Sequence, residues 1–303
     1  MAKIVLGVNN CWAVKRFVEP ESWIEITATK FDIKYVQFSF DLLDPRTPIE
    51  IAKDYIDRCK DLLKEYGVEI HSTFTGLAAY SFNLLLHPDP LLRLDALDWY
   101  CRAIEVTSLM GVKATGGHIG AMSMRDYENE DRRKLLLEIL IEEVAGLTAH
   151  AKTRGLNMIL WEPMPISREP PSSIEEAETI IDKVNKIAKV PVKLCIDVGH
   201  ACNPKASSTK DLDPYEWLRS LAKYTPCLHI QQTDGKADRH WPFTEEYNKI
   251  GIIKPDKVIH ALEEGGAEEV YLFLEIIHPF EAREETVLSD IIKSVKYWKD
   301  YLS

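Results

Sequence analysis

Eight short apolar runs recur along the chain, and longer amphipathic segments separate them. Strands that read as continuous apolar runs and alternate with helices form parallel sheets that helices cover. The runs are KIVLGV (3–8), IKYVQFSF (33–40), VEIHSTF (68–74), GVKATGGHI (111–119), LNMILWE (156–162), VKLCIDV (192–198), CLHIQQ (227–232) and VYLFLEII (270–277). Because these eight units follow one another without a linker or a break in composition, the sequence predicts a single (β/α)8 TIM barrel, one domain over residues 1–303, rather than an open sheet.

Apolar residues on one helical face predict the covering helices. Residues 51–63 form such a stripe, which stops at Gly67, a residue suited to the left-handed position after a helix. A second stripe spans 174–187, and Ser172 with Glu175 has the spacing of a capping box at its start. Residues 135–151 and 291–301 show the same periodicity, so we expect all four segments to be helices.

Acidic residues outnumber basic ones, 48 to 37, which gives a formal net charge of −11 at pH 7. This balance argues against a broad basic face for nucleic acid or for an anionic membrane. No apolar run approaches membrane-spanning length, and the six cysteines form no CxxC pair. We therefore expect a cytoplasmic protein with reduced cysteines, no targeting segment, no membrane or nucleic-acid partner and a small-molecule substrate. These features are compatible with a homo-oligomer.

Polar residues gather where the predicted strands end, which is the face on which such barrels carry their active sites. A carboxylate or an imidazole is costly to bury at such a place unless something pairs with it. The residues are His71 after the third run, His118 after the fourth, Glu162 after the fifth, Asp197 and His200 after the sixth, His229 and Gln231 on the seventh and Glu275 on the eighth. If the barrel closes, these side chains meet at one mouth.

Four of these residues come from four successive strands: Glu162, Asp197, His229 and Glu275. Any one of them alone is equally well explained as a hydrogen-bonded charge at a strand end. Together, three carboxylates and one imidazole favour a divalent metal site, whereas a metal-free binding protein would leave them without a purpose. Such ligands suit Mn²⁺, our first expectation, as well as Co²⁺ or Mg²⁺, and Zn²⁺ is also compatible.

The segments WEP, CIDVGH, LHIQQTD and FLEI resemble the metal-binding strand ends of the xylose-isomerase-like TIM barrels. The resemblance is to the sugar-phosphate isomerase/epimerase group, which includes the ketose 3-epimerases. It covers the whole chain in layout, while the specific motifs lie in the second half. It implies that Glu162, Asp197, His229 and Glu275 are the metal ligands and that His200 contacts the substrate.

A chemical route follows from this resemblance. A ketose binds the metal through its carbonyl and a neighbouring hydroxyl, and the metal stabilises the cis-enediolate that forms when a carbon-bound proton leaves. Glu162 and Glu275 approach from opposite sides, so one can remove the proton while the other returns one. Return to the opposite face of the same carbon is epimerisation, and return to the neighbouring carbon is aldose–ketose isomerisation. The same residues serve both outcomes.

Candidate substrate-binding residues surround this set. The ketose 3-epimerases usually carry an arginine shortly beyond the strand-seven histidine, and the matching position here is about Gly235, with Lys236 and Arg239 close by. Arg168 is a further candidate because guanidinium groups suit phosphate oxygens, although each cation alone is as well explained as a surface charge. Together they favour a small phosphorylated ketose over a free sugar. The full set of candidates is His71, His118, Arg168, His200, Gln231, Lys236, Arg239 and Trp12, whose ring could wall a sugar pocket.

A rival reading rests on DRH, residues 238–240. Read with the other strand-end residues, this motif resembles the trinuclear zinc site of the endonuclease IV type of apurinic endonuclease, which implies hydrolysis of abasic DNA or another phosphate ester. The acidic net charge and loops poor in Lys and Arg oppose DNA binding. Additional Zn²⁺ stays open even in a sugar enzyme. Its candidate ligands are His71, His118, His200, Asp238 and His240.

Overall fold

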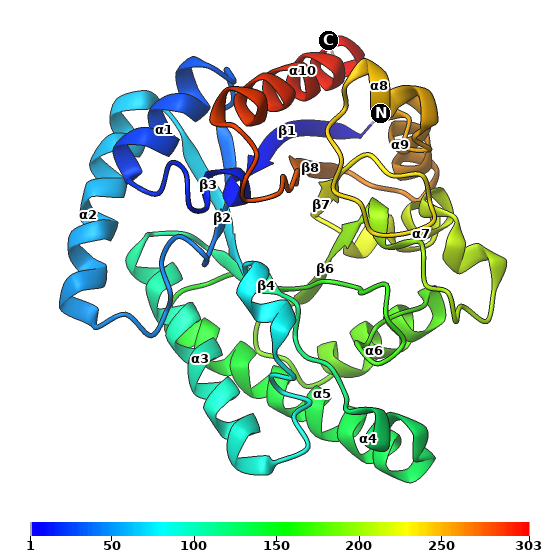
Figure 1. Cartoon of the computed structure of the whole chain (residues 1–303). Helices are drawn as coiled ribbons and strands as arrows, with labels where there is room; N and C mark the ends of the chain where they lie inside the picture. The colour runs from blue at the N-terminus through cyan, green and yellow to red at the C-terminus, as the bar shows by residue number, and fades with distance from the viewer. Residues whose placement is uncertain (1, 303) are drawn as a thin grey trace.

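Parallel pairing joins each strand to the next one in the sequence, and β1 also pairs with β8, so the sheet closes into a barrel (Figure 1). The computed structural model describes residues 2–302. The strands are β1 (Lys3–Asn9), β2 (Tyr35–Ser39), β3 (Glu69–Phe74), β4 (Ala114–Gly117), β5 (Met158–Trp161), β6 (Val192–Asp197), β7 (Cys227–Ile230) and β8 (Glu269–Leu274). Each lies within or overlaps one predicted apolar run, which confirms the predicted (β/α)8 barrel.

Helices surround the barrel, as Figure 1 shows. They are α1 (Pro20–Thr29), α2 (Ile49–Tyr66), α3 (Pro90–Leu109), α4 (Met124–Glu128), α5 (Glu130–Thr153), α6 (Ile174–Asn185), α7 (Pro214–Leu221), α8 (Glu245–Ile250), α9 (Pro255–Glu264) and α10 (Glu284–Leu302). Short 3₁₀ helices lie in the loops: η1 (Asn10–Ala13), η2 (Leu77–Ser81), η3 (Val198–His200), η4 (Thr209–Leu212) and η5 (Ala222–Tyr224). All four predicted helices are present.

Helix ends follow the local sequence with one shift. Gly67 ends α2 with a φ of +67°, as the sequence predicts. The capping box predicted at Ser172 and Glu175 is wrong by one residue, because Ser173 is the residue whose side chain accepts from the backbone N–H of Glu176. The Glu176 carboxylate in turn accepts from the backbone N–H of Ser172 at 2.7 Å. The reciprocal bonding survives with a changed register.

Two apolar layers hold the mouth in place. The larger lies between the sheet and the helices. The smaller is formed by inward-facing strand residues, namely Phe74, Ala114, Leu160, Cys195, Cys227 and Phe273. Because this smaller layer is fully packed, polar groups at the carboxyl ends of the strands have an apolar floor beneath them.

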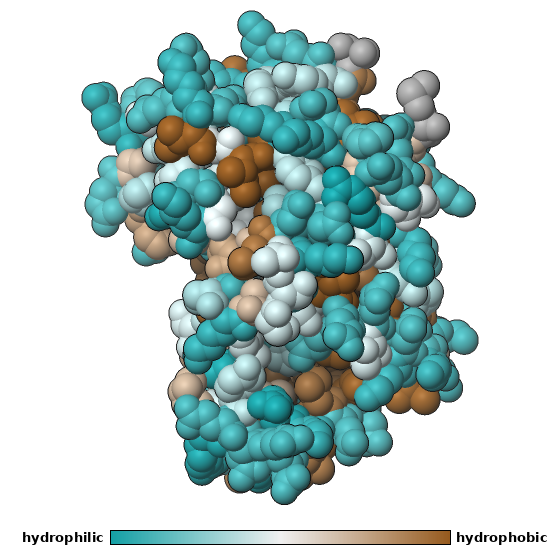
Figure 2. Space-filling model, turned by 90° about the vertical axis from the view of Figure 1, so that its right-hand side faces the viewer, coloured by the Kyte–Doolittle hydropathy of each residue, from teal (hydrophilic) through white to brown (hydrophobic). Residues whose placement is uncertain are grey.

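The six cysteines are free, as predicted for a reduced protein. Figure 2 shows a face on which hydrophobic residues are scattered among hydrophilic ones, the ordinary pattern of a folded surface. Within residues 2–302, no helix has the length and apolarity that a membrane crossing requires.

Candidate metal centre

Four side chains converge at the carboxyl ends of β5 to β8 and form what we call the inner group: Glu162, Asp197, His229 and Glu275. Each offers one ligand atom, and these four atoms lie within 4.8 Å of one another. All four residues are buried. The inner group is the set of four that the sequence predicts as metal ligands.

The imidazole of His229 lies at the centre of the inner group. Its Nδ1 is 3.0 Å from Glu162 Oε1, 3.0 Å from Glu275 Oε2 and 4.0 Å from Asp197 Oδ2. The other ring nitrogen, Nε2, is 2.5 Å from Gln37 Oε1. Since that amide oxygen can only accept, it fixes a proton on Nε2, so Nδ1 is the ring nitrogen that faces the carboxylates. The ring is therefore prepared as a metal ligand.

Residues of β1 and β2 support two members of the inner group from behind. Asn9 Nδ2 donates to Gln37 Oε1 at 3.0 Å and to Glu275 Oε1 at 3.1 Å. One amide thus orients both Gln37 and the rear oxygen of Glu275. The front oxygen of Glu275, Oε2, stays directed at His229. Bonds of this kind orient metal ligands and raise their affinity for an ion.

Asp197 is held by the loop that follows it and by Gln231, which follows β7. Its Oδ1 accepts from the backbone N–H of Gly199 at 2.6 Å and from Gln231 Nε2 at 3.0 Å. A Cβ on Gly199 would lie 2.3 Å from the Gln231 amide carbon, so only glycine permits this approach. The glycine between Asp197 and His200 thereby has a steric explanation.

Tyr80 supports the fourth member, and the sequence did not reveal it. The residue lies in η2, between β3 and α3, and its hydroxyl donates to Glu162 Oε2 at 2.6 Å. Glu162 Oε1 remains directed at His229 Nδ1. A tyrosine in an irregular loop has no periodicity or strand-end position to mark it, so no sequence signal pointed to it.

The charge of the inner group calls for a cation. Three carboxylates face one imidazole, and within residues 2–302 no lysine or arginine forms an ion pair with any of the three. Burial raises the pKa of Asp197 to about 6, which shows the cost of charging it without a counter-ion. Three oxygen ligands and one nitrogen ligand fit a divalent ion such as Mn²⁺. The residues present therefore fit the predicted metal.

A second set, the outer group, consists of Asp197, His200, Asp238 and His240, and its ligand atoms also lie within 4.8 Å of one another. Asp238 Oδ2 is 3.5 Å from His200 Nε2 and 3.1 Å from His240 Nε2. Burial opposes the charge of His240, but its hydrogen bond and attraction to Asp238 outweigh it and raise the pKa to about 9. Two carboxylates thus face two imidazoles that favour the charged form, so this group balances its charge by itself.

Gln231 links the two groups, in line with its predicted place in the site. Its amide nitrogen donates to Asp197 and, at 2.6 Å, to Asp238 Oδ1. Its amide oxygen accepts from the backbone N–H of His240. His240 has a φ of +49°, a left-handed conformation that is uncommon for residues other than glycine. The loop after β7 is thereby bent back over Asp197.

A cavity of about 650 Å³ opens above both groups. Its lining includes Tyr80, Glu169, His200, Lys236, His240 and Glu275. Lys236 is the one lysine or arginine among the described residues that line it. Glu169, which the sequence analysis missed, is buried, and this burial raises its pKa to about 7. The cavity has room for a small sugar or sugar phosphate and offers both acidic and basic groups.

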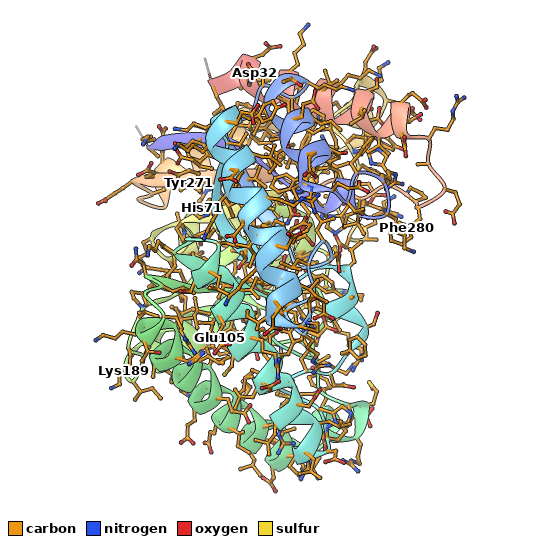
Figure 3. All side chains as sticks on the ribbon, turned by 90° about the vertical axis from the view of Figure 1, so that its left-hand side faces the viewer. Asp32, His71, Glu105, Lys189, Tyr271 and Phe280 are labelled. Atoms are coloured by element: carbon orange, nitrogen blue, oxygen red, sulfur yellow. The ribbon has the colours of Figure 1, made fainter. Side chains whose placement is uncertain are left out.

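The predicted place of His71 at the mouth is wrong. His71 lies in the middle of β3, which continues to Phe74, and its ring packs against Tyr271 at 4.4 Å and Phe273 at 5.3 Å between centroids. Figure 3 shows His71 and Tyr271 toward one end of the barrel and Phe280, in the loop after β8, toward the other. His71 therefore packs in the lower layer of the barrel and belongs to neither group.

His118 follows β4, as predicted, but belongs to neither group. Its ring stacks on Tyr80, with centroids 5.1 Å apart, and neither ring nitrogen has a hydrogen-bond partner among residues 2–302. Burial lowers its pKa to about 3, so the ring is neutral. Tyr80 thus lies between His118 and Glu162, and His118 is not one of the four side chains that converge in the inner group.

Three other predicted substrate contacts are occupied elsewhere, and none lines the cavity. Arg168 donates to the carbonyl of Met122 at 2.5 Å. Arg239 pairs with Asp234 at 3.2 Å and lies over the ring of Trp241. Trp12 is buried against Phe17 and Phe31, so it packs in the core instead of walling a sugar pocket. Of the predicted substrate contacts, Lys236 and His200 line the cavity. His240, which was predicted as an additional metal ligand, lines it as well.

Several known proteins are similar to this chain. The model of a family described as "Xylose isomerase-like TIM barrel" matches residues 27–297. D-erythrulose 1-phosphate 3-epimerase of Brucella abortus (strain 2308) is 28% identical over 301 residues, which cover 99% of this chain and 96% of that protein.

Solved structures are also similar to this chain. A "Putative Xylose isomerase" of Rhodospirillum rubrum is 35% identical with a TM-score of 0.91, and the match covers 98% of this chain and 99% of that one. D-psicose 3-epimerase of Clostridium cellulolyticum, crystallised with D-tagatose, is 15% identical with a TM-score of 0.71 and 99% coverage of both chains. At that identity, the second match shows a common fold.

Proposed function

Because the chain belongs to the xylose isomerase-like TIM barrel family, we propose that it is a divalent-metal-dependent enzyme that epimerises or isomerises a small ketose or ketose phosphate. One observation carries the proposal: three buried carboxylates and one oriented imidazole face a common centre beneath a cavity of about 650 Å³. The erythrulose-phosphate 3-epimerase from Brucella supports the same class of reaction.

Glu162, Asp197, His229 and Glu275 would hold the ion through Oε1, Oδ2, Nδ1 and Oε2. We favour Mn²⁺, with Co²⁺, Mg²⁺ and Zn²⁺ as further candidates. When bound, a divalent ion supplies a Lewis acid that polarises the substrate carbonyl and stabilises the charge of an enediolate. Gln37, Asn9 and Gln231 keep the ligand atoms directed inward.

Glu162 and Glu275 carry the proton transfers in this proposal. They follow β5 and β8, which β6 and β7 separate, so their carboxylates reach the centre from different sides. One removes the carbon-bound proton and the other returns a proton. Delivery to the opposite face of the same carbon gives the epimer, and the 3-epimerase activity named for the Brucella relative favours that outcome over isomerisation.

A ketose phosphate is the favoured substrate. Lys236 supplies a positive charge to the cavity wall and has no ion pair within residues 2–302. His200 and His240 lie on the same wall, where both pair with Asp238. An ammonium group without an ion-pair partner suits a phosphate dianion. The relative that acts on D-erythrulose 1-phosphate makes this four-carbon ketose phosphate the first compound to test.

The test is solvent deuterium incorporation. The protein, stripped of metal and reloaded with Mn²⁺, is incubated in D₂O with D-erythrulose 1-phosphate and, separately, with free ketoses. We expect a deuterium at C3 and formation of the C3 epimer, with faster turnover of the phosphate ester. A glutamate variant far from the mouth, Glu138→Gln, is the control for handling. Absence of exchange from every ketose and ketose phosphate would overturn the proposal.

A second function has one observation in its favour. Asp197 belongs to both groups, so ions in both would share its carboxylate, and paired ions suit hydrolysis of phosphate esters. The trinuclear zinc set suggested by the DRH motif also needs His71, whose ring packs against Tyr271. Abasic DNA and simple phosphate esters are therefore the second assay, to be run if two or more Zn²⁺ ions are found per chain.

A further inference from the structure

The two glutamates of the inner group differ in the donor that holds the rear oxygen. Asn9 donates an amide N–H to Glu275 Oε1 at 3.1 Å. Tyr80 donates a hydroxyl to Glu162 Oε2 at 2.6 Å. The amide comes from the end of β1, whereas the hydroxyl comes from a loop and lies on the wall of the cavity. Glu162 therefore depends on an irregular segment for its orientation.

That segment is itself firmly attached. The carboxylate of Asp41 accepts from the backbone N–H of Leu77 at 2.6 Å and of Ala78 at 3.2 Å. Gly76 packs so closely on Asp41 that a Cβ there would lie 2.1 Å from the carboxyl carbon. Asn83, on the other side of Tyr80, donates to the carbonyl of Ala121 at 2.6 Å. The loop is thus fixed on both sides of Tyr80, so its hydroxyl has a defined position.

The ring of Tyr80 is fixed as well. It stacks on His118 with an interplanar angle of 23°. His118 is in turn held by its backbone, because its N–H donates to Thr75 Oγ1 at 3.0 Å and its carbonyl accepts from the hydroxyl of Tyr100. Tyr80 therefore has a rigid partner on its ring face and an acceptor at its hydroxyl, which is more order than a loop tyrosine needs for packing alone.

We propose that Tyr80 is a positioning residue for Glu162: its hydroxyl holds Oε2 so that Oε1 alone faces the metal centre and the reacting carbon. This inference rests on the proposed function. Without the hydroxyl, Glu162 gains rotational freedom, and the outer-sphere bond that orients it is lost. Loss of such a partner lowers metal affinity or activity about 10- to 100-fold in other metal sites.

Tyr80→Phe tests the proposal, and Tyr55→Phe is the matched control. Both variants remove one tyrosine hydroxyl, but the Tyr55 hydroxyl donates to the backbone carbonyl of Val18 at 3.3 Å, outside both groups and away from the cavity lining. We expect Tyr80→Phe to weaken Mn²⁺ binding about tenfold, measured by titration and by the electron paramagnetic resonance spectrum of bound Mn²⁺. We expect kcat to fall about 10- to 100-fold with KM changed less than about threefold. Tyr55→Phe should change neither quantity.

The outcomes separate the two claims. If Tyr80→Phe matches Tyr55→Phe in Mn²⁺ affinity, spectrum and kcat, the positioning role is overturned. A weakened Mn²⁺ site in Tyr80→Phe, found while the unaltered protein turns over no ketose, would uphold the positioning role and reject the proposed function. Thermal unfolding of both variants checks that each is folded before the comparison is made.

Discussion

The inner and outer groups share Asp197, but the fold builds them in different ways. Members of the inner group lie at or near the carboxyl ends of the strands β5 to β8, and all four are buried. The outer group takes Asp238 and His240 from the loop after β7, and their side chains are 32% and 15% exposed. Strand ends are rigid and loops adapt, so the inner group is the more precisely placed of the two.

The two groups also differ in charge. With the shared Asp197 counted in each, the inner group sets three carboxylates against one imidazole, whereas the outer group sets two carboxylates against two imidazoles. With Asp197 counted once, four carboxylates face three imidazoles, and the excess of carboxylates lies in the inner group. Burial of an unbalanced negative charge is costly unless a cation joins it. A balanced set of ion pairs has no such need. Convergence of ligand-type residues is therefore not enough to identify a metal site, and the charge left over decides which group requires an ion.

The largest expected effect comes from the residue that both groups share. Asp197→Ala removes one ligand of the inner group and the acceptor of two hydrogen bonds from Gln231. We expect this variant to lose bound Mn²⁺ and all measurable turnover, as checked by elemental analysis and by the deuterium-exchange assay. Full metal occupancy in Asp197→Ala would contradict the ligand assignment.

The two glutamates should separate metal binding from proton transfer. Glu162→Gln and Glu275→Gln each keep an oxygen that can bind the ion but lose the base. We expect turnover to fall about 10²- to 10⁴-fold in each variant while the fold and part of the Mn²⁺ binding persist. Rates with D-erythrulose 1-phosphate and its C3 epimer measure the effect. A variant that keeps most of its activity removes that glutamate from the acid/base role.

Breaking the outer group should have a smaller effect. His240→Gln removes one of the two imidazoles that balance Asp238 but leaves every inner ligand in place. We expect Mn²⁺ content to be unchanged and kcat/KM to fall about tenfold, through loss of one charged hydrogen bond. If His240→Gln loses as much of its bound metal as Asp197→Ala does, the outer group also holds an ion.

Lys236 distinguishes a phosphorylated substrate from a free sugar. In Lys236→Met, we expect KM for D-erythrulose 1-phosphate to rise about 10- to 100-fold, because a charged hydrogen bond contributes about 1.5–3 kcal/mol. Turnover of any free ketose should stay the same. An equal loss with phosphorylated and free substrates would assign Lys236 a role other than phosphate binding.

The smallest effect concerns stability and pH. Burial raises the pKa of Glu169 from 4.5 to about 7. The folded protein thus binds this proton more tightly than the unfolded chain, so stability falls as pH rises from about 4.5 to about 7. Glu169→Gln should remove this loss and stabilise the protein above pH 7 by at most about 3 kcal/mol, with no gain below pH 4.5. Urea unfolding at several pH values measures the difference, and a gain that does not vary with pH would exclude titration of Glu169 as its cause.

The sequence predicted the barrel and the inner group for the same physical reason. A buried parallel strand must be apolar throughout, so a charged residue at its end stands out, as Glu162 does after LNMILW. Four such residues in successive strands must meet once the sheet closes. The outer group was visible through the DRH motif, although its balanced charge became evident only from the ion pairs of Asp238.

Loops and strand registers account for what the sequence did not predict. Tyr80 and Glu169 lie in irregular segments, where no periodicity assigns a side chain to the cavity. His71 was misplaced because a polar residue inside an apolar run was read as the end of the strand, whereas β3 ends at Phe74. Arg168 was misassigned because the sequence could not show that the carbonyl of Met122 would take its guanidinium.

Metal content per chain tests the central claim most directly. The unaltered protein and His240→Gln are purified without added metal or chelator, and their metals are determined by elemental analysis alongside protein concentration. The charge argument predicts about one Mn²⁺, or another divalent ion, per chain in both proteins. No bound metal in the unaltered protein, or two or more Zn²⁺ ions that fall in number in His240→Gln, would contradict it.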